Sequence, residues 1–129
     1  MRCIILAACL WGLCLQSAHA RSQHHLLQNP AHDMVQTLHH MGQMLNTVDN
    51  KQEAAAASSE LRQLYTRFSQ LQQAAEQQQE MSPAALEHHL AQMDSAMNYF
   101  RLACARLVRE KFYGSASLSK AVKEIASQF

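Results

Sequence analysis

Two histidine–methionine pairs are the residues of this sequence with the clearest capacity for chemistry. His40 precedes Met44 by four positions, and His89 precedes Met93 by four, each inside a His-His-x-x-Gln-Met run. Residues four apart are neighbours on one face of a helix. An imidazole next to a thioether suits copper, and Cu(I) in particular favours the sulfur. A periplasmic protein that binds copper-type metals through these four side chains is therefore one hypothesis for the function.

The surrounding pattern favours a simpler role for the same residues. Met41 and Met93 already belong to apolar seams, and the paired histidines lie off those seams, as ordinary exposed residues do. In an antiparallel bundle the two pairs lie roughly 25 Å apart, so one chain does not bring both to a single ion. The sequence also predicts no cofactor. Met34 could ligate haem, but residues 117–129, the last helix, contain no histidine partner.

The sequence shows no recognisable catalytic motif. Glu87-His88-His89 lacks the spacing of a zinc-protease HExxH helix. Cys104 lies on an apolar seam between Phe100 and Leu107, where a buried small hydrophobe is the expected role, with a reactive or intermolecularly bonded thiol as the alternative. We therefore expect that the protein is not an enzyme.

The composition predicts a single all-helical domain. The 129 residues suit one domain with an ordinary core. Hydrophobic residues make up 48% and charged residues 16%, which excludes compositional disorder. The chain has only three Gly and two Pro and is rich in Ala, Leu, Gln and Met, which lose little side-chain freedom in a helix.

The first twenty residues have the pattern of a cleavable signal peptide. Arg2 precedes an apolar run, residues 3–15, and Ala18-His19-Ala20 matches the cleavage pattern. A lipoprotein signal ending at Cys9 is the alternative. Cleavage after Ala20 leaves Cys104 as the single cysteine, without an internal disulfide, and a mature net charge of zero with neutral histidines. We expect a periplasmic or secreted protein with no stable membrane anchor and no nucleic-acid partner.

The mature chain divides into a mobile polar tail, residues 21–29, and one helical bundle, residues 30–129. Asn29-Pro30 and Ser82-Pro83 are cap-then-proline signals, and Asp49 with Gln52 predicts a capping box between the first two helices. Gly114 is the expected stop of the third helix, with Arg106, Arg109 and Lys111 complementing its negative end. The apolar seams are Met34, Leu38, Met41, Leu45 and Val48; Ala57, Leu61, Leu64, Phe68, Leu71 and Ala75; Leu86, Leu90, Met93, Met97, Phe100, Cys104 and Leu107; and Leu118, Val122, Ile125 and Phe129.

These seams predict an antiparallel up-down, coiled-coil-like bundle. Two long helices of roughly 30 residues form a central hairpin, with a shorter N-terminal and a short C-terminal helix packed against one end. Leu71 and the stretch 86–93 are then left partly uncovered toward the hairpin tip. Exposed apolar stripes of this kind favour self-association or another protein partner. The alternative is a monomer in which tyrosines and glutamine stems cover the seam.

Parts of the sequence resemble small exported helical proteins of unknown function found in some bacteria. The resemblance covers residues 45–50, the alanine-rich stretch leading to Leu61-Arg62-Gln63-Leu64, and Tyr113-Gly114-Ser115 followed by Leu118. It implies an exported bacterial helical protein and carries no known activity.

Taken together, these patterns favour an exported, non-catalytic module of the cell envelope that acts through protein contact. Metal binding through His40, Met44, His89 and Met93 is the alternative function. A chaperone-like holdase is a third hypothesis, because methionine-containing faces repack adaptably around different partners.

Overall fold

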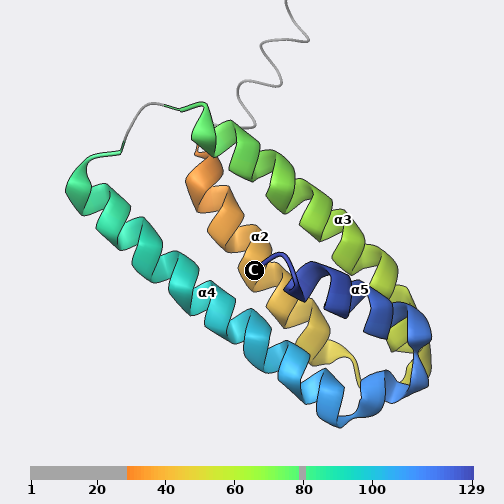
Figure 1. The fold of residues 1–129 in the computed structure, drawn as a ribbon. Coiled ribbons are helices and arrows are strands. Elements are labelled where there is room, and N and C mark those ends of the chain that lie inside the picture. The colour runs from red at the N-terminus through yellow and green to blue at the C-terminus, as the bar shows by residue number, and fades with distance from the viewer. Residues whose placement is uncertain (1–28, 79–80) are drawn as a thin grey trace, which may run out of the picture.

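The structure is a computed structural model that describes residues 29–78 and 81–129. These residues form helix α2 (Pro30–Thr47), helix α3 (Lys51–Glu76), helix α4 (Pro83–Arg109), a short turn η1 (Lys111–Gly114) and helix α5 (Ala116–Ala126) (Figure 1). The described part of the chain contains no strand, so the all-helical prediction is confirmed. The predicted signal peptide and residues 21–28 of the predicted tail lie outside it. No described helix combines the length and the apolar character needed to cross a membrane.

Both cap-then-proline signals begin helices where the sequence predicted. The Asn29 side chain accepts a hydrogen bond from the backbone N–H of His32 at 3.1 Å, and Ser82 accepts one from Ala85 at 3.3 Å. The capping box before α3 was predicted one residue too early. Asn50, not Asp49, is the cap, because its side chain accepts from the N–H of Glu53. The Glu53 carboxylate accepts in turn from the N–H of Asp49 at 3.0 Å.

The four helices occupy the four corners of a square in cross-section. Helix α2 packs against both α3 and α4, and α5 packs mainly on α3 and lightly on α4. Over their described lengths, neither α3 and α4 nor α2 and α5 approach within 8 Å between Cα atoms. Figure 1 shows that α2 and α4 begin at the end of the molecule where α3 ends. The long helices therefore do not form the predicted central hairpin, because α2 separates them.

The close packing of α2 on α4 depends on Gly42. A Cβ atom at this position would lie 2.6 Å from the ring of Tyr99 and 3.3 Å from the Cα of Phe100. The Tyr99 ring stacks on His39, one turn earlier on α2, with 4.8 Å between ring centroids. Residue 42 of α2 thus lies level with residue 100 of α4, and the two helices are held in that register.

Helix α4 ends earlier than the sequence predicted, and the turn after it has an unusual backbone. Lys111, Phe112 and Tyr113 all have φ near +50°, and Gly114 follows with φ of +77°. The predicted stop at Gly114 is therefore wrong, since α4 ends at Arg109. Left-handed backbone costs about 1–2 kcal/mol for each residue that has a Cβ. Phe112 holds the turn in place because its side chain is buried in the core.

We predict that Lys111→Gly stabilises the protein by about 1 kcal/mol. Lys111 is exposed, so the substitution removes left-handed strain and no core contact. The entropy that glycine adds to the unfolded chain offsets part of this gain. Urea unfolding followed by circular dichroism measures the change. Lys51→Gly, in the first turn of α3, is the control and should destabilise. A loss of stability in Lys111→Gly would contradict the prediction.

Candidate functional site

The structure separates the two members of the first histidine–methionine pair. His40 is exposed on α2, whereas Met44 is buried in the hydrophobic core. In the second pair, His89 and Met93 are both half-buried on α4.

A polar hollow between α2 and α3 gathers other residues around His40. It has a volume of about 380 Å³ and is lined by Asp33, Gln36, Thr37, His39, His40, Gln43, Leu64 and Arg67. His39 is held by its stack on Tyr99, and the Thr37 hydroxyl donates to the Asp33 backbone oxygen at 2.8 Å. Among the described residues, no three or more His, Cys, Asp or Glu side chains are grouped closely enough to hold a metal ion.

The metal hypothesis leads to a direct titration. We predict that the chain from Arg21 to Phe129 and its His40→Ala/His89→Ala variant bind Cu(II), Ni(II) and Zn(II) equally weakly, because Met44 is buried away from the surface that carries His40. Isothermal titration calorimetry measures the affinities. Submicromolar copper binding that is lost in the double variant would instead favour a metal site.

Cys104 lies where the seam predicted, facing the interior of the bundle. It is half-buried and lines a cavity of about 120 Å³ together with Met97, Phe100, Arg101, Ala126 and Phe129. Burial raises the pKa of its thiol from 9.0 to about 11, against a smaller lowering by a backbone hydrogen bond. A thiol with a raised pKa is a poor nucleophile at neutral pH.

We therefore predict slow modification of Cys104 in the folded chain. At pH 8 the fraction of thiolate, and with it the alkylation rate, should be roughly a hundredfold lower than in the urea-unfolded chain. The unfolded thiol ionises from about pH 9, whereas the folded thiol stays protonated to about pH 11. The folded state therefore binds more protons across this window, so stability falls as the pH rises through it. Iodoacetamide labelling of residues 21–129 with and without urea measures the rate. Equal rates would contradict the raised pKa.

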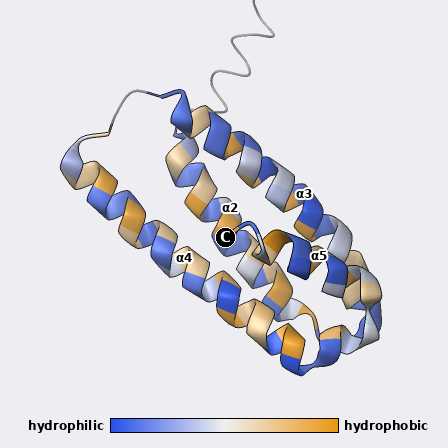
Figure 2. Cartoon of the chain, in the orientation of Figure 1, coloured by the Kyte–Doolittle hydropathy of each residue, from blue (hydrophilic) through white to orange (hydrophobic). Residues whose placement is uncertain are grey.

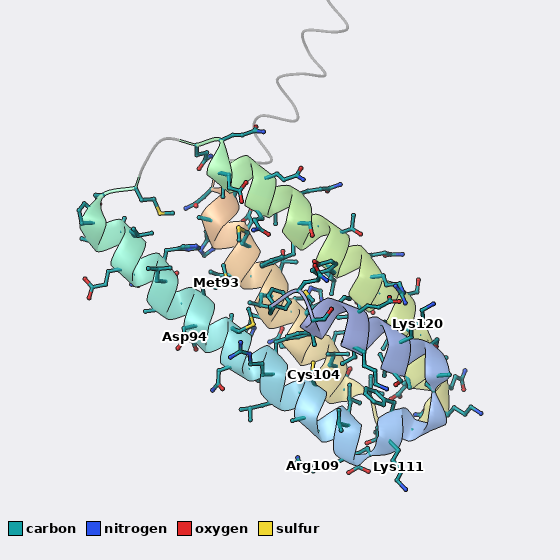
Figure 3. All side chains as sticks on the ribbon, viewed as in Figure 1. Met93, Asp94, Cys104, Arg109, Lys111 and Lys120 are labelled. Atoms are coloured by element: carbon teal, nitrogen blue, oxygen red, sulfur yellow. The ribbon has the colours of Figure 1, made fainter. Side chains whose placement is uncertain are left out.

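An apolar groove lies between α3 and α4 in the described part of the chain. We call it the α3–α4 groove. At the end of the groove nearest Phe129 there is a pocket of about 200 Å³. It is lined by Met34, Tyr65, Phe68, Gln72, Met93, Met97, Gln128 and Phe129. Figure 3 places Met93 on the side of α4 toward α2 and Asp94 on the outer side. Methionine side chains are unbranched and polarisable, so this surface can adapt to an apolar ligand.

Phe129 closes one end of this groove. Its ring makes edge-to-face contacts with Tyr65, Phe68 and Phe100, at centroid distances of 6.3, 5.5 and 5.8 Å. The sequence placed Phe129 on the stripe of the last helix, but α5 ends at Ala126. The four-residue spacing from Ile125 indicated an inward-facing residue and did not indicate that its ring would bridge α3 and α4.

Beyond this pocket the apolar stripe of α4 continues as exposed side chains toward the first turns of the helix. The exposed fraction is 44% for Leu86 and 58% for Leu90, as the sequence predicted for this stretch. Figure 2 shows apolar positions reaching the first turns of α4. Leu71 was predicted to be uncovered too, and this is wrong. It is 3% exposed and belongs to the hydrophobic core, to which α2 and α3 both contribute.

Neither protein-family models, nor curated proteins, nor solved structures give a match to this chain. The resemblance to small exported bacterial proteins thus stays an expectation.

Proposed function

We propose that this protein is an exported, non-catalytic interaction module of the cell envelope, and that its α3–α4 groove binds a helical segment of a partner protein. One observation carries the proposal. The fourth corner of the bundle is filled along only part of its length, since α5 has 11 residues and α4 has 27. At 1.5 Å per residue, α5 is roughly 20 Å shorter than the helices it packs between.

The open part of that corner has the properties of a helix-binding groove. Helix α2 forms its floor through Met34, and α4 lines it with Met93 and Met97. Leu86 and Leu90 continue the same stripe of α4 at helical spacing and are exposed. Exposed apolar patches of this kind mark binding sites, and an amphipathic helix laid in a groove is a recurrent mode of recognition. The same corner already accepts a helix of this chain, because α5 lies in it with Leu118, Val122 and Ile125 buried.

Site-specific photocrosslinking tests this function. A benzophenone amino acid is placed at Leu90, on the exposed stripe that continues Met93 and Met97, or at Leu102, which is 61% exposed on the opposite face of α4. In cells that make the protein, we expect a discrete crosslinked product from position 90 and none from position 102. The same products from both positions, or none from position 90, would reject the groove as a binding site.

Export is tested separately by N-terminal sequencing of the protein recovered from the periplasm or the medium. We expect the mature sequence to begin at Arg21, one residue after the Ala18-His19-Ala20 pattern. A protein found only in the cytoplasm with residues 1–20 intact would contradict it.

A further inference from the structure

The charges of the molecule are divided between its two halves. Phe129 marks the boundary, since it contacts Phe68 of α3 and Phe100 of α4, and Phe100 lies level with Gly42 of α2. We call residues 29–42, 68–78 and 81–100 the open half, and residues 43–67 and 101–129 the closed half.

The open half is acidic and has no basic side chain other than histidine. It carries Asp33, Glu76, Glu87 and Asp94, and it contains no Lys or Arg. The closed half has nine Lys and Arg against five Asp and Glu, a net charge of +4. Figure 3 shows Arg109, Lys111 and Lys120 in the closed half. The mature charge of zero thus conceals two halves of opposite sign.

The acidic residues of the open half lie beside the apolar groove. Glu87 and Asp94 are exposed on α4, next to the stripe of Leu86, Leu90 and Met97, and Glu76 is exposed at the end of α3. Arg67 is the cation of α3 nearest to the groove. It lies on the other side of that helix, where it lines the polar hollow between α2 and α3 together with Asp33. Arg101 of α4 lies at the Phe129 end of the groove, so the negative side chains flank the part of the apolar surface farther from Phe129. Negative side chains beside an apolar surface attract cationic partners and repel acidic ones.

We propose that the α3–α4 groove is specific for cationic amphipathic helices, with an apolar stripe that packs on Leu90, Met93 and Met97 and with Lys or Arg on its flanks. This inference rests on the proposed function and names the partner of the same groove. The chain's own occupant of that corner is an amphipathic helix with one more cation than anion on its exposed side. Helix α5 buries Leu118, Val122 and Ile125 and exposes Lys120, Lys123 and Glu124, of which Glu124 pairs with Arg62 of α3.

Charge also decides against a second copy as the occupant. Pairing two open halves tip to tip would bring together two surfaces that each carry the carboxylates of Glu76, Glu87 and Asp94. Like charges at an interface are costly, so the uncovered stripe of α4 is a poor match for itself. An anionic membrane surface is disfavoured for the same reason.

The test uses two synthetic helical peptides of 14 residues, one built from Leu and Lys and the other with Glu in place of every Lys. Calorimetric titration into the chain from Arg21 to Phe129, which holds every described residue, gives the affinities. We expect micromolar binding of the Leu/Lys peptide and at least tenfold weaker binding of the Leu/Glu peptide. Raising the salt from about 50 to 300 mM should weaken the Leu/Lys complex several-fold.

Matched variants locate the binding. Leu90→Gln should weaken the Leu/Lys complex about tenfold, whereas Leu102→Gln, an equally exposed change on the opposite face of α4, should not. Glu87→Gln/Asp94→Asn should weaken it roughly fivefold, and Glu60→Gln/Glu110→Gln in the closed half should not. Circular dichroism of each variant establishes that it is folded.

The possible outcomes distinguish the preference for cationic helices from the more general proposal that the groove binds a helix. Equal binding of both peptides, with sensitivity to Leu90→Gln, would overturn the cationic preference and leave a helix-binding groove. Binding that Leu90→Gln and Leu102→Gln weaken equally, or no binding of either peptide, would overturn the inference, and the crosslinking at position 90 then decides the function. A dimer in sedimentation equilibrium that Leu90→Gln dissociates would make a second copy the occupant and overturn it too.

Discussion

Replacing Arg106 by alanine is expected to lower the free energy of unfolding by about 3 kcal/mol. The Arg106 guanidinium donates to the backbone oxygens of Leu45 and Val48, at 2.8 and 2.9 Å, and to the Tyr113 hydroxyl at 3.0 Å. It therefore joins α4 to the carboxyl end of α2 and to the turn η1. A cation at this place also complements the negative end of the α2 dipole.

The size of the effect follows from what alanine leaves behind. Hydrogen bonds from a charged donor contribute about 1.5–3 kcal/mol each, and the two carbonyls lose this donor. One opposing cost limits the total, because the Arg106 Nε is buried with no hydrogen-bond partner among the described residues. Removing the side chain relieves that cost. The net estimate is therefore well below the sum of three charged hydrogen bonds.

Urea unfolding of residues 21–129 checks the prediction, with Arg109→Ala as the control. Arg109 is exposed in the last turn of α4, so its loss should change stability by less than about 0.5 kcal/mol. Arg106→Lys should fall between the two, because an ammonium lacks the planar fork of a guanidinium. Equal effects of Arg106→Ala and Arg109→Ala would show that the three hydrogen bonds contribute little.

The second large effect is expected at Gly42. Gly42→Leu should destabilise the protein by about 3 kcal/mol, although leucine is the better helix former by nearly 1 kcal/mol. The Cβ alone would meet the Tyr99 ring at 2.6 Å and the Phe100 backbone at 3.3 Å. Tyr99 can move only by leaving its stack on His39, and the Phe100 backbone moves only with α4.

A double-variant cycle isolates the cause. Gly42→Ala should cost about 1–2 kcal/mol, and most of that cost should disappear in a Tyr99→Ala background, where the space is free. Ala55→Leu, at an exposed position of α3, is the control and should be close to neutral. If Gly42→Ala stabilised the protein, helix propensity would outweigh the clash, and the close approach of α2 and α4 would be wrong. Because α2 is the floor of the α3–α4 groove, Gly42→Leu should also weaken peptide binding there.

The sequence alone determined the elements that depend on near neighbours in the chain. The caps at Asn29 and Ser82 need only a side-chain oxygen and an N–H three residues later, so a short segment encodes them. The helices follow from the spacing of their apolar residues, and the exposure of Leu86 and Leu90 follows from a helix longer than its neighbours. The cap at Asn50 was missed by one residue, because Asp49 and Asn50 are both good caps and only the backbone geometry selects between them.

Only the tertiary structure decided which helix covers which seam. An apolar stripe indicates that one face of a helix is buried, but it does not indicate which other helix packs on that face. For this reason α3 and α4 were predicted as neighbours, although α2 lies between them. Arg106 was predicted to complement the end of its own helix. It instead reaches the end of α2, about 60 positions away in the chain, because helix packing brings that end beside it.

The same reason explains why the sequence predicted only the exposed stretch 86–93 of the candidate site and not the groove beside it. His40 and Met44 are neighbours along α2, yet the contacts of α2 with α3 and α4 leave one exposed and bury the other. The α3–α4 groove and the acidic side chains beside it consist of residues from three helices, and Phe129 from beyond α5 closes one end. A binding surface assembled from distant segments exists only after those segments pack. The shape of the surface and its electrostatic potential both depend on how the segments are arranged in space.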